Sequence, residues 1–205
     1  SSGGGASGGA NDLTVGAYIA LRNAGNANHG GYFSVQSVSS DEMAIAQKGG
    51  DWFDGGIWLE MHRHTYTPGN GPLNGTWDQQ YDAIGDINNA ITSAAGNADA
   101  IAELKVIRAL LHWRLLDLYG RIRYITEGGV ASAQLSRADG VTRIQDEILD
   151  VLGITVADSA NLDNATFSSD LSTSKVAYRV SRYAALGLLA KVYINAEVYT
   201  GTGKY

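Results

Sequence analysis

The sequence predicts an all-α protein, built of helical hairpins that are joined by long irregular loops. Two stretches carry the helical prediction. Apolar side chains over residues 77–91 recur at steps of four and three, which places them in one stripe along a helix. Residues 104–119 form a second long periodic run, and Gly120 follows where a left-handed helix cap is expected. Residues 49–75 show no such period and predict a long loop.

The beginning of the chain is rich in Ser, Gly and Ala. We assign residues 1–11 to a flexible tether, either a remnant of expression or a natural spacer, and residues 12–205 to the folded part. A first helix is expected over residues 12–22, followed by a Gly/Asn-rich loop over residues 23–32. Residues 39–42 read Ser-Ser-Asp-Glu and predict the start of a second helix, because carboxylates favour the positive end of the helix dipole.

The second half of the chain predicts long helices in pairs. One begins at residue 76 and fades at Ala94-Ala95-Gly96, and the others are expected over residues 98–119, 136–159 and 181–194. A polar stretch over residues 161–174 separates the last helix from the one before it. Each pair has about the length of a tetratricopeptide unit, and such hairpins stack because none can bury its apolar face alone.

The composition excludes several classes of protein. The formal net charge is −6 and no basic cluster occurs, which argues against nucleic acid as a partner. No apolar run is long enough to span a bilayer, and no cleavable signal is recognisable. Cysteine is absent from the 205 residues, so disulfides and cysteine metal sites are excluded.

Five blocks in order carry a resemblance to a known family. The blocks are Ser39–Glu42; Asp51-Trp-x-Asp-Gly55 with the later His62-x-His64-Thr65; Trp77, Tyr81, Ile84, Asn88 and Ile91; Arg108-Ala109 with Leu118-Tyr119-Gly120; and Arg179–Ala185 with Leu188–Ile194 and Tyr199-Thr-Gly201. After residue 11 the chain resembles the N-terminal portion of the SusD-like (RagB/SusD) outer-membrane lipoproteins of Bacteroidota. It departs from them in having no proline after Tyr119-Gly120, no lipidated cysteine, and no counterpart of their C-terminal region.

The resemblance implies a tetratricopeptide-like α/α superhelix at the cell surface. A lipid anchor N-terminal to this chain would hold it on the outer membrane, where it would cover a SusC-like TonB-dependent transporter. It would bind a glycan, an oligosaccharide or a peptide for import, and it would not be an enzyme. The residues expected to build the scaffold are Trp77, Tyr81, Asn88, Arg108, Tyr119 and Gly120.

The candidate ligand site lies in the loop over residues 49–75. Glycan binding needs flat aromatic faces and polar groups for hydroxyls, and this loop supplies both. The candidate ligand-binding residues are Trp52, Trp58, His62, His64, Tyr66 and Asn70. The alternative is that these aromatic side chains only pin the loop to the helices, in which case the protein is a helical-repeat interaction scaffold without a small ligand.

The same loop offers weak metal patterns. His62 and His64 lack a third ligand at metal spacing, and imidazoles in such loops pair more often with carboxylates than with zinc. Asp51 and Asp54 resemble a fragment of a calcium loop, but the ligand order is wrong; we predict no metal and no cofactor and leave a structural calcium open.

Other charged side chains are read as structural. Arg108 lies in an apolar helix and is expected to pair with a carboxylate of the preceding helix. Asp78, Asp82 and Asp86 share one helix face, where they meet either solvent and arginines or a polar partner. No Gly-x-Ser-x-Gly turn or other nucleophile motif is present, which argues against catalysis.

Overall fold

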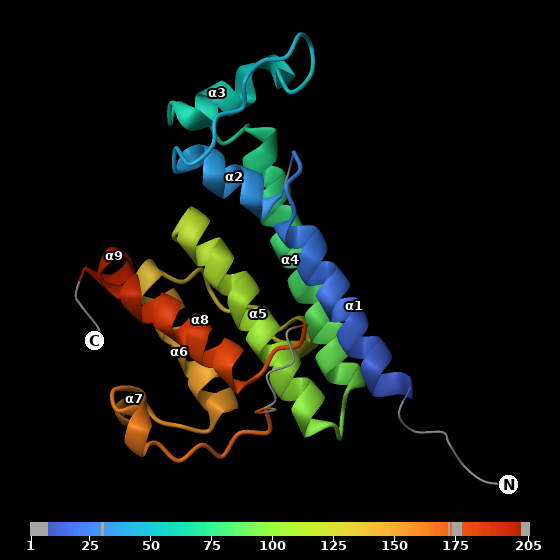
Figure 1. The fold of residues 1–205 in the computed structure, drawn as a ribbon, viewed down its shortest axis with the longest axis vertical. Coiled ribbons are helices and arrows are strands. Elements are labelled where there is room, and N and C mark those ends of the chain that lie inside the picture. The colour runs from blue at the N-terminus through green and yellow to red at the C-terminus, as the bar shows by residue number, and fades with distance from the viewer. Residues whose placement is uncertain (1–7, 30, 172, 174–177, 202–205) are drawn as a thin grey trace, which may run out of the picture. The chain divides into compact units, whose positions relative to one another are not determined.

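The computed structural model describes residues 8–29, 31–171, 173 and 178–201 (Figure 1). Within these ranges the regular structure is helical and no strand occurs, which confirms the predicted all-α class. The helices are α1 (Gly8–Gly25), α2 (Tyr32–Ser39), α3 (Ile57–His62), α4 (Gly71–Ser93), α5 (Ala98–Tyr119), α6 (Arg137–Leu152), α7 (Val156–Ser159), α8 (Arg182–Ile194) and α9 (Ala196–Thr200). Short 3-10 turns η1 (Asp54–Gly56), η2 (Glu127–Gly129) and η3 (Leu162–Asn164) lie between them.

The chain divides into two compact units. The larger unit comprises Ser1–Tyr18 and Ile84–Tyr205, and the smaller unit comprises Ile19–Ala83. The helices α1 and α4 each contribute residues to both units. No helix in the described part of the chain is both long enough and apolar enough to cross a membrane.

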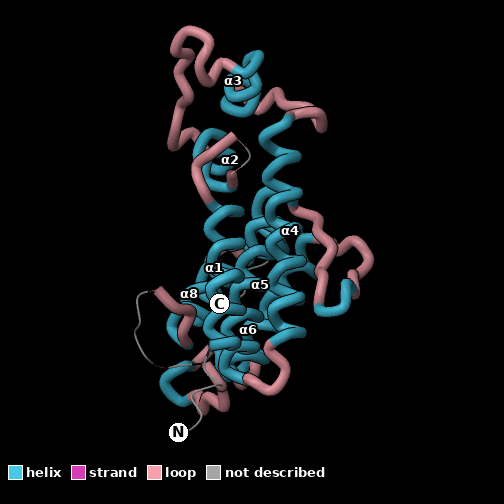
Figure 2. The backbone as a smooth tube through the Cα atoms, turned by 90° about the vertical axis from the view of Figure 1, so that its right-hand side faces the viewer, coloured by secondary structure: helices cyan, strands magenta, loops and turns pink. Residues whose placement is uncertain are grey.

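The larger unit is centred on α5. This helix packs against α6 and α8, and α6 packs in turn against α8 and α9 (Figures 1 and 2). Apolar residues lie on every side of α5, as expected of a helix enclosed by others. The most deeply buried side chains of the α5–α6 pair are Leu104, Ile107, Leu111, Leu115, Leu116, Ile144, Ile148 and Leu152.

Both ends of α5 lie where the sequence predicts them. The side chain of Asn97 accepts a hydrogen bond from the backbone N–H of Ala100 at 3.1 Å and so caps the first turn. Gly120 ends the helix with φ 73°, a left-handed conformation that glycine adopts without a steric cost.

The helix predicted over residues 136–159 is shorter in the structure. Ser136 caps its start, but Gly153 adopts φ 65° directly after Leu152 and ends α6 there. Residues 156–159 form the separate short helix α7, whose start is fixed by a capping box between Thr155 and Asp158. The apolar period continues past Gly153, which is why the sequence pattern predicted one long helix.

The smaller unit corrects three further predictions. Residues 49–75 are not one continuous loop, because η1 and α3 lie within them and α4 begins before their end. The helix expected to begin at residues 39–42 instead ends there: α2 starts at Tyr32 and buries Val35 and Val38, and Asp41 has φ 61°. The helix α4 begins at Gly71 rather than at residue 76, because the amide oxygen of Asn70 caps the N–H of Leu73 at 3.3 Å.

The N-terminal prediction is partly outside the described residues. Residues 1–7 of the predicted tether are among those that the structure does not describe. The helix α1 begins at Gly8 and continues to Gly25, so the loop predicted over residues 23–32 is confined to the residues between α1 and α2.

Candidate functional site

An aromatic cluster in the smaller unit is organised by one carboxylate. The Oδ2 atom of Asp54 accepts a hydrogen bond from Trp58 Nε1 at 2.8 Å and lies 2.9 Å from His29 Nε2. The imidazole of His29 stacks on Trp52, with ring centroids 4.3 Å apart and planes inclined by 19°. The rings of Trp58 and Trp52 are tilted relative to each other, and their centroids are 5.5 Å apart. These contacts bring the candidate residues Trp52 and Trp58 together and add His29.

The rings of this cluster differ in exposure. Trp58 is only 2% exposed, so it offers no open face to a ligand and serves to support Trp52. Trp52 is half-buried, whereas the side chain of His29 is 57% exposed. Phe53 and Tyr66 are each 45% exposed. Among the candidate rings and His29, those accessible to a ligand are therefore His29, Trp52, Phe53 and Tyr66.

The two predicted loop histidines hold the backbone around Asp41. His62 Nδ1 lies 2.9 Å from Asp41 Oδ1, and His64 Nε2 lies 2.8 Å from the carbonyl oxygen of Ser39. From the sequence, pairing of these imidazoles with carboxylates was favoured over a zinc site, and His62 makes such a pair with Asp41. Within the described residues, no three side chains of His, Cys, Asp or Glu converge to hold a metal ion.

Asn70 has a structural position. It is 3% exposed, its amide oxygen caps α4, and its amide nitrogen donates to the carbonyl oxygen of Ile57 at 3.4 Å. Both ends of the amide group are thus engaged in joining α3 to α4. Asn70 shapes the loop and does not face a ligand.

Left-handed backbone is concentrated in this region. In the described ranges, the non-glycine residues with positive φ are Asp41 (61°), Trp52 (57°), Asp54 (46°) and His64 (54°). Such conformations are unfavourable for residues with a Cβ and persist only where the surroundings enforce them. Each of these residues is held by one of the contacts above, so the loop is fixed in shape before any ligand arrives.

His29 is the residue that sequence reasoning missed. It lies in the Gly/Asn-rich connection after α1, far along the chain from Trp52. No short-range pattern links the two positions, and only the folded contact with Asp54 and Trp52 reveals the role of His29.

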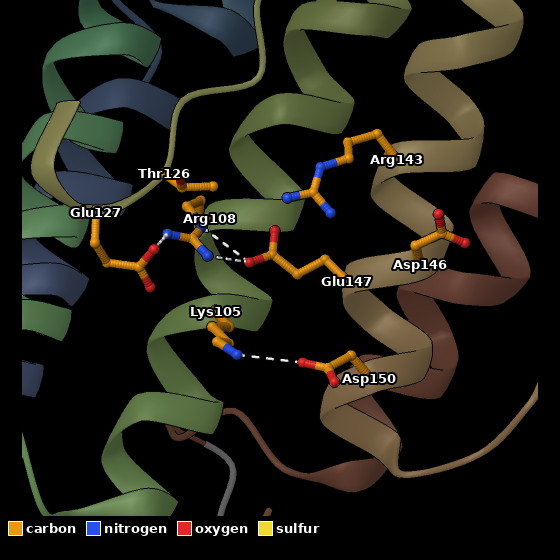
Figure 3. Close-up of a pocket in the computed structure, with 8 residues that line it drawn as sticks. All are labelled: Lys105, Arg108, Thr126, Glu127, Arg143, Asp146, Glu147 and Asp150. Atoms are coloured by element: carbon orange, nitrogen blue, oxygen red, sulfur yellow. Dashed lines mark hydrogen bonds and ion pairs between the residues drawn. The ribbon is translucent and has the colours of Figure 1, made fainter. Parts of the chain in front are cut away.

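A second feature is a charged cavity in the larger unit, between α5 and α6 (Figure 3). Its volume is about 460 Å³. The residues that line it are Lys105, Arg108, Thr126, Glu127, Arg143, Asp146, Glu147 and Asp150.

Arg108 forms the floor of this cavity. It is 2% exposed; its Nε donates to Glu147 Oε1 at 2.9 Å, and its Nη2 also pairs with that carboxylate. Its Nη1 donates to Asn88 Oδ1 at 2.7 Å and to Glu127 Oε2 at 3.0 Å. The prediction that Arg108 pairs with a carboxylate of the preceding helix is wrong: α4 supplies the amide of Asn88, and the carboxylates come from α6 and η2.

A buried stack of His112 and Tyr124 contacts the residues of this cavity. Their ring centroids lie 3.8 Å apart, and the Tyr124 hydroxyl donates to Glu147 Oε2. The backbone N–H of Ile125 donates to His112 Nε2 at 3.1 Å, so Nδ1 carries the proton and donates to the carbonyl oxygen of Arg108 at 3.0 Å. Burial lowers the pKa of His112 to about 3, so this imidazole is neutral near neutral pH.

The other predicted scaffold residues also lie in α4 and α5. The rings of Trp77 and Tyr81 pack one turn apart on α4, with centroids 4.9 Å apart. Asn88 Nδ2 donates to the carbonyl oxygen of Ile125 at 3.2 Å, which ties α4 to the segment after α5. Tyr119 is the last residue of α5, directly before the capping Gly120.

Comparison with known proteins gives no assignment: no protein-family model matches this chain, and no curated protein matches it in sequence.

Proposed function

We propose that this protein is a cell-surface nutrient-binding component of the SusD type. It captures a glycan or oligosaccharide on the stacked pair His29 and Trp52, with Phe53 and Tyr66 as the other exposed aromatic side chains of residues 49–75. It then passes the ligand to a SusC-like TonB-dependent transporter in the outer membrane. The five sequence blocks that resemble the SusD-like lipoproteins support this class, and the fixed stack of His29 on Trp52 supports a binding role.

The observation that carries the proposal is the stack of His29 on Trp52, held by Asp54. Sugar rings have apolar faces that pack on aromatic side chains, and their hydroxyls need hydrogen-bonding groups beside those rings. His29 Nε2 lies 2.9 Å from Asp54 Oδ2, which leaves Nδ1 as the ring nitrogen that can hydrogen-bond to a sugar hydroxyl. The left-handed residues keep these groups in place, so little ordering is needed on binding.

The proposed site divides the predicted residues into two groups. Trp52 and Tyr66 contact the ligand, together with His29 and Phe53. Trp58, His62, His64 and Asn70 hold the shape of the loop, since their contacts with Asp54, Asp41, Ser39 and the ends of α3 and α4 are internal.

Isothermal titration against a panel of soluble polysaccharides tests the proposal. The variants Trp52→Ala and Tyr66→Ala should each weaken binding at least about tenfold, the loss of one well-packed aromatic contact. Tyr178→Ala is the matched control, because Tyr178 is 80% exposed and belongs to the larger unit. If a polysaccharide binds and neither variant changes its affinity, the ligand does not lie on these rings.

A second candidate function is a helical scaffold whose ligand is another protein. It is favoured by apolar side chains on the outer face of α8 and α9, where Tyr183 is 51%, Ile194 is 73% and Val198 is 69% exposed. Exposed apolar surface of this kind is typical of interaction sites. If the protein is such a scaffold, the Ile194→Glu variant should no longer co-purify with the transporter, and the native chain should bind no polysaccharide.

A further inference from the structure

We infer that the charged cavity between α5 and α6 is a second ligand site, which takes a short uncharged saccharide of disaccharide size. The choice of a saccharide rests on the proposed function; the location and the polarity of the site rest on the cavity itself.

The floor of the cavity is preformed. Arg108 is saturated by Glu147, Glu127 and Asn88, and Glu147 also accepts the hydroxyl of Tyr124. The side chains of Arg108 and Glu147 are 3% and 5% exposed, so these charges are fixed by packing as well as by hydrogen bonds. A ligand therefore meets charged groups that are held in place and are already paired with one another.

The rim keeps unused hydrogen-bonding groups of both kinds. The guanidinium of Arg143 lies over the ring of Tyr124, 4.9 Å from its centroid. Among the described residues, neither Arg143 nor Asp146 has an ion-pair partner within 4.0 Å. The ammonium group of Lys105 donates one hydrogen bond to Asp150 Oδ2 at 3.2 Å, and its other N–H groups can donate to a ligand. The cavity is therefore lined by the cations Lys105 and Arg108 on α5 and by Arg143 and three carboxylates on α6 (Figure 3).

The balance of charge selects an uncharged ligand. The lining contributes three cations, Lys105, Arg108 and Arg143, and four carboxylates, Glu127, Asp146, Glu147 and Asp150. A full charge of either sign meets repulsion close to any attraction, whereas a hydroxyl both donates and accepts. The faces of the Tyr124 ring are covered by His112 and Arg143, so the ligand is held by hydrogen bonds rather than by stacking.

The size of the ligand follows from a neighbouring cavity of about 300 Å³. The two cavities share Lys105 and Asp150, whose ion pair stands between them. The second cavity is partly apolar, lined by Ala98, Ile101, Ala102 and Val151 in addition to polar residues. One sugar ring in the charged cavity then places a second ring over this less polar neighbour, which indicates a disaccharide.

Saturation-transfer NMR with the whole chain and a panel of neutral disaccharides tests the inference, with glucosamine and glucuronate as charged comparisons. The variants Arg143→Ala and Asp146→Asn should each weaken disaccharide binding at least about tenfold, the effect of losing a hydrogen bond to a charged group. Both side chains are exposed, so thermal unfolding should not change. The matched controls are Arg121→Ala and Asp163→Asn, which alter exposed residues outside the cavity.

The outcomes separate this site from the one at Trp52 and Tyr66. Disaccharide binding that survives Trp52→Ala with Tyr66→Ala but is lost in Arg143→Ala supports the inference. Binding that survives both cavity variants overturns it, as does a complete lack of disaccharide binding by a chain that still binds polysaccharide. Stronger binding of either charged sugar overturns the preference for an uncharged ligand. Disaccharide binding by a chain that binds no polysaccharide keeps the cavity and removes the proposed role of the aromatic side chains.

Discussion

At the scale of single residues, the larger unit depends on a few buried polar side chains. Arg108, Glu147 and His112 lie in the helix pair that forms the core, and each is fully hydrogen-bonded. Buried charges of this kind are costly when one partner is removed, because the remaining charge cannot be hydrated.

Replacing Arg108 with alanine should lower the free energy of unfolding by about 3–5 kcal/mol, because the carboxylate of Glu147 would remain buried without its cation. Urea denaturation measures this effect. Lys105→Ala is the matched control: its partner Asp150 is 70% exposed, so the change should cost less than about 1 kcal/mol. Equal losses in the two variants would contradict the structural role given to Arg108.

The stability of the larger unit should fall as the pH decreases through the range in which histidine normally titrates. The pKa of His112 is about 3 in the folded state and 6.5 in its reference state, so the unfolded chain takes up the proton first. The contribution of the neutral His112 to the free energy of unfolding is therefore fully present above about pH 6.5 and decreases progressively toward pH 3. Urea midpoints measured from pH 7 to pH 4 should show this slope, and His112→Gln should reduce it. A slope unchanged by the substitution would assign the pH dependence to other groups.

At the scale of helices, glycine positions decide where elements end. Gly153 has φ 65°, and a Cβ there would lie 2.8 Å from the backbone carbon of Ser168. Gly153→Ala should therefore lower the free energy of unfolding by about 1–3 kcal/mol, from left-handed strain and from the clash. Gly85 is exposed inside α4 and has open space around its Cα, so Gly85→Ala should raise stability by about 0.5–1 kcal/mol. Thermal and urea unfolding of both variants measure the contrast, and effects of the same sign would contradict it.

The helices that the sequence predicted well are those with local signals at both ends. Asn97 and Gly120 mark the limits of α5, and its bounds agree with the prediction. The limits of α6 and α2 were missed for different reasons. Gly153 interrupts an apolar period that continues beyond it, and α2 is a short helix stabilised by burial of Val35 and Val38 rather than by an end signal.

In the candidate site, too, local features of the sequence could be predicted and the contacts of the folded chain could not. The aromatic stretch is visible in the sequence, because a segment rich in Trp and His stands out from the long helical periods. The short helix α3 within it, which carries Trp58 and His62, was missed. The part played by each ring is not visible there: Trp58 is buried and His29 joins from another segment. Burial and long-range contact are properties of the folded chain, and no spacing in the sequence encodes them.

At the scale of the whole molecule, one polar cluster joins distant parts of the larger unit. Glu103, 2% exposed on α5, accepts hydrogen bonds from the Tyr18 hydroxyl of α1 and from the guanidinium of Arg179, which precedes α8. The Tyr18 oxygen also accepts from the backbone N–H of Val180 at 2.6 Å. Burial and the hydrogen bond to Glu103 raise the pKa of Tyr18 above its ordinary value, so its hydroxyl keeps its proton.

Removing this hydroxyl should loosen the first and last parts of the larger unit together. Tyr18→Phe should lower the free energy of unfolding by about 1–3 kcal/mol, since Glu103 loses a donor and Val180 loses an acceptor. Hydrogen exchange should then increase both in α1 and at the start of α8. Tyr193→Phe is the control, because its hydroxyl bonds only to the nearby Ser159 side chain in the described residues. Faster exchange confined to α1 would contradict a shared cluster.

The proposed function depends on the capture of a glycan on the exposed rings of His29, Trp52, Phe53 and Tyr66. Hydroxyl-radical footprinting of the native chain, with and without a saturating polysaccharide ligand, tests it most directly. Trp52, Phe53 and Tyr66 should become protected, whereas Tyr178, which is 80% exposed in the larger unit, should react as before. Saturating ligand that leaves Trp52, Phe53 and Tyr66 as reactive as in the free protein would contradict the claim.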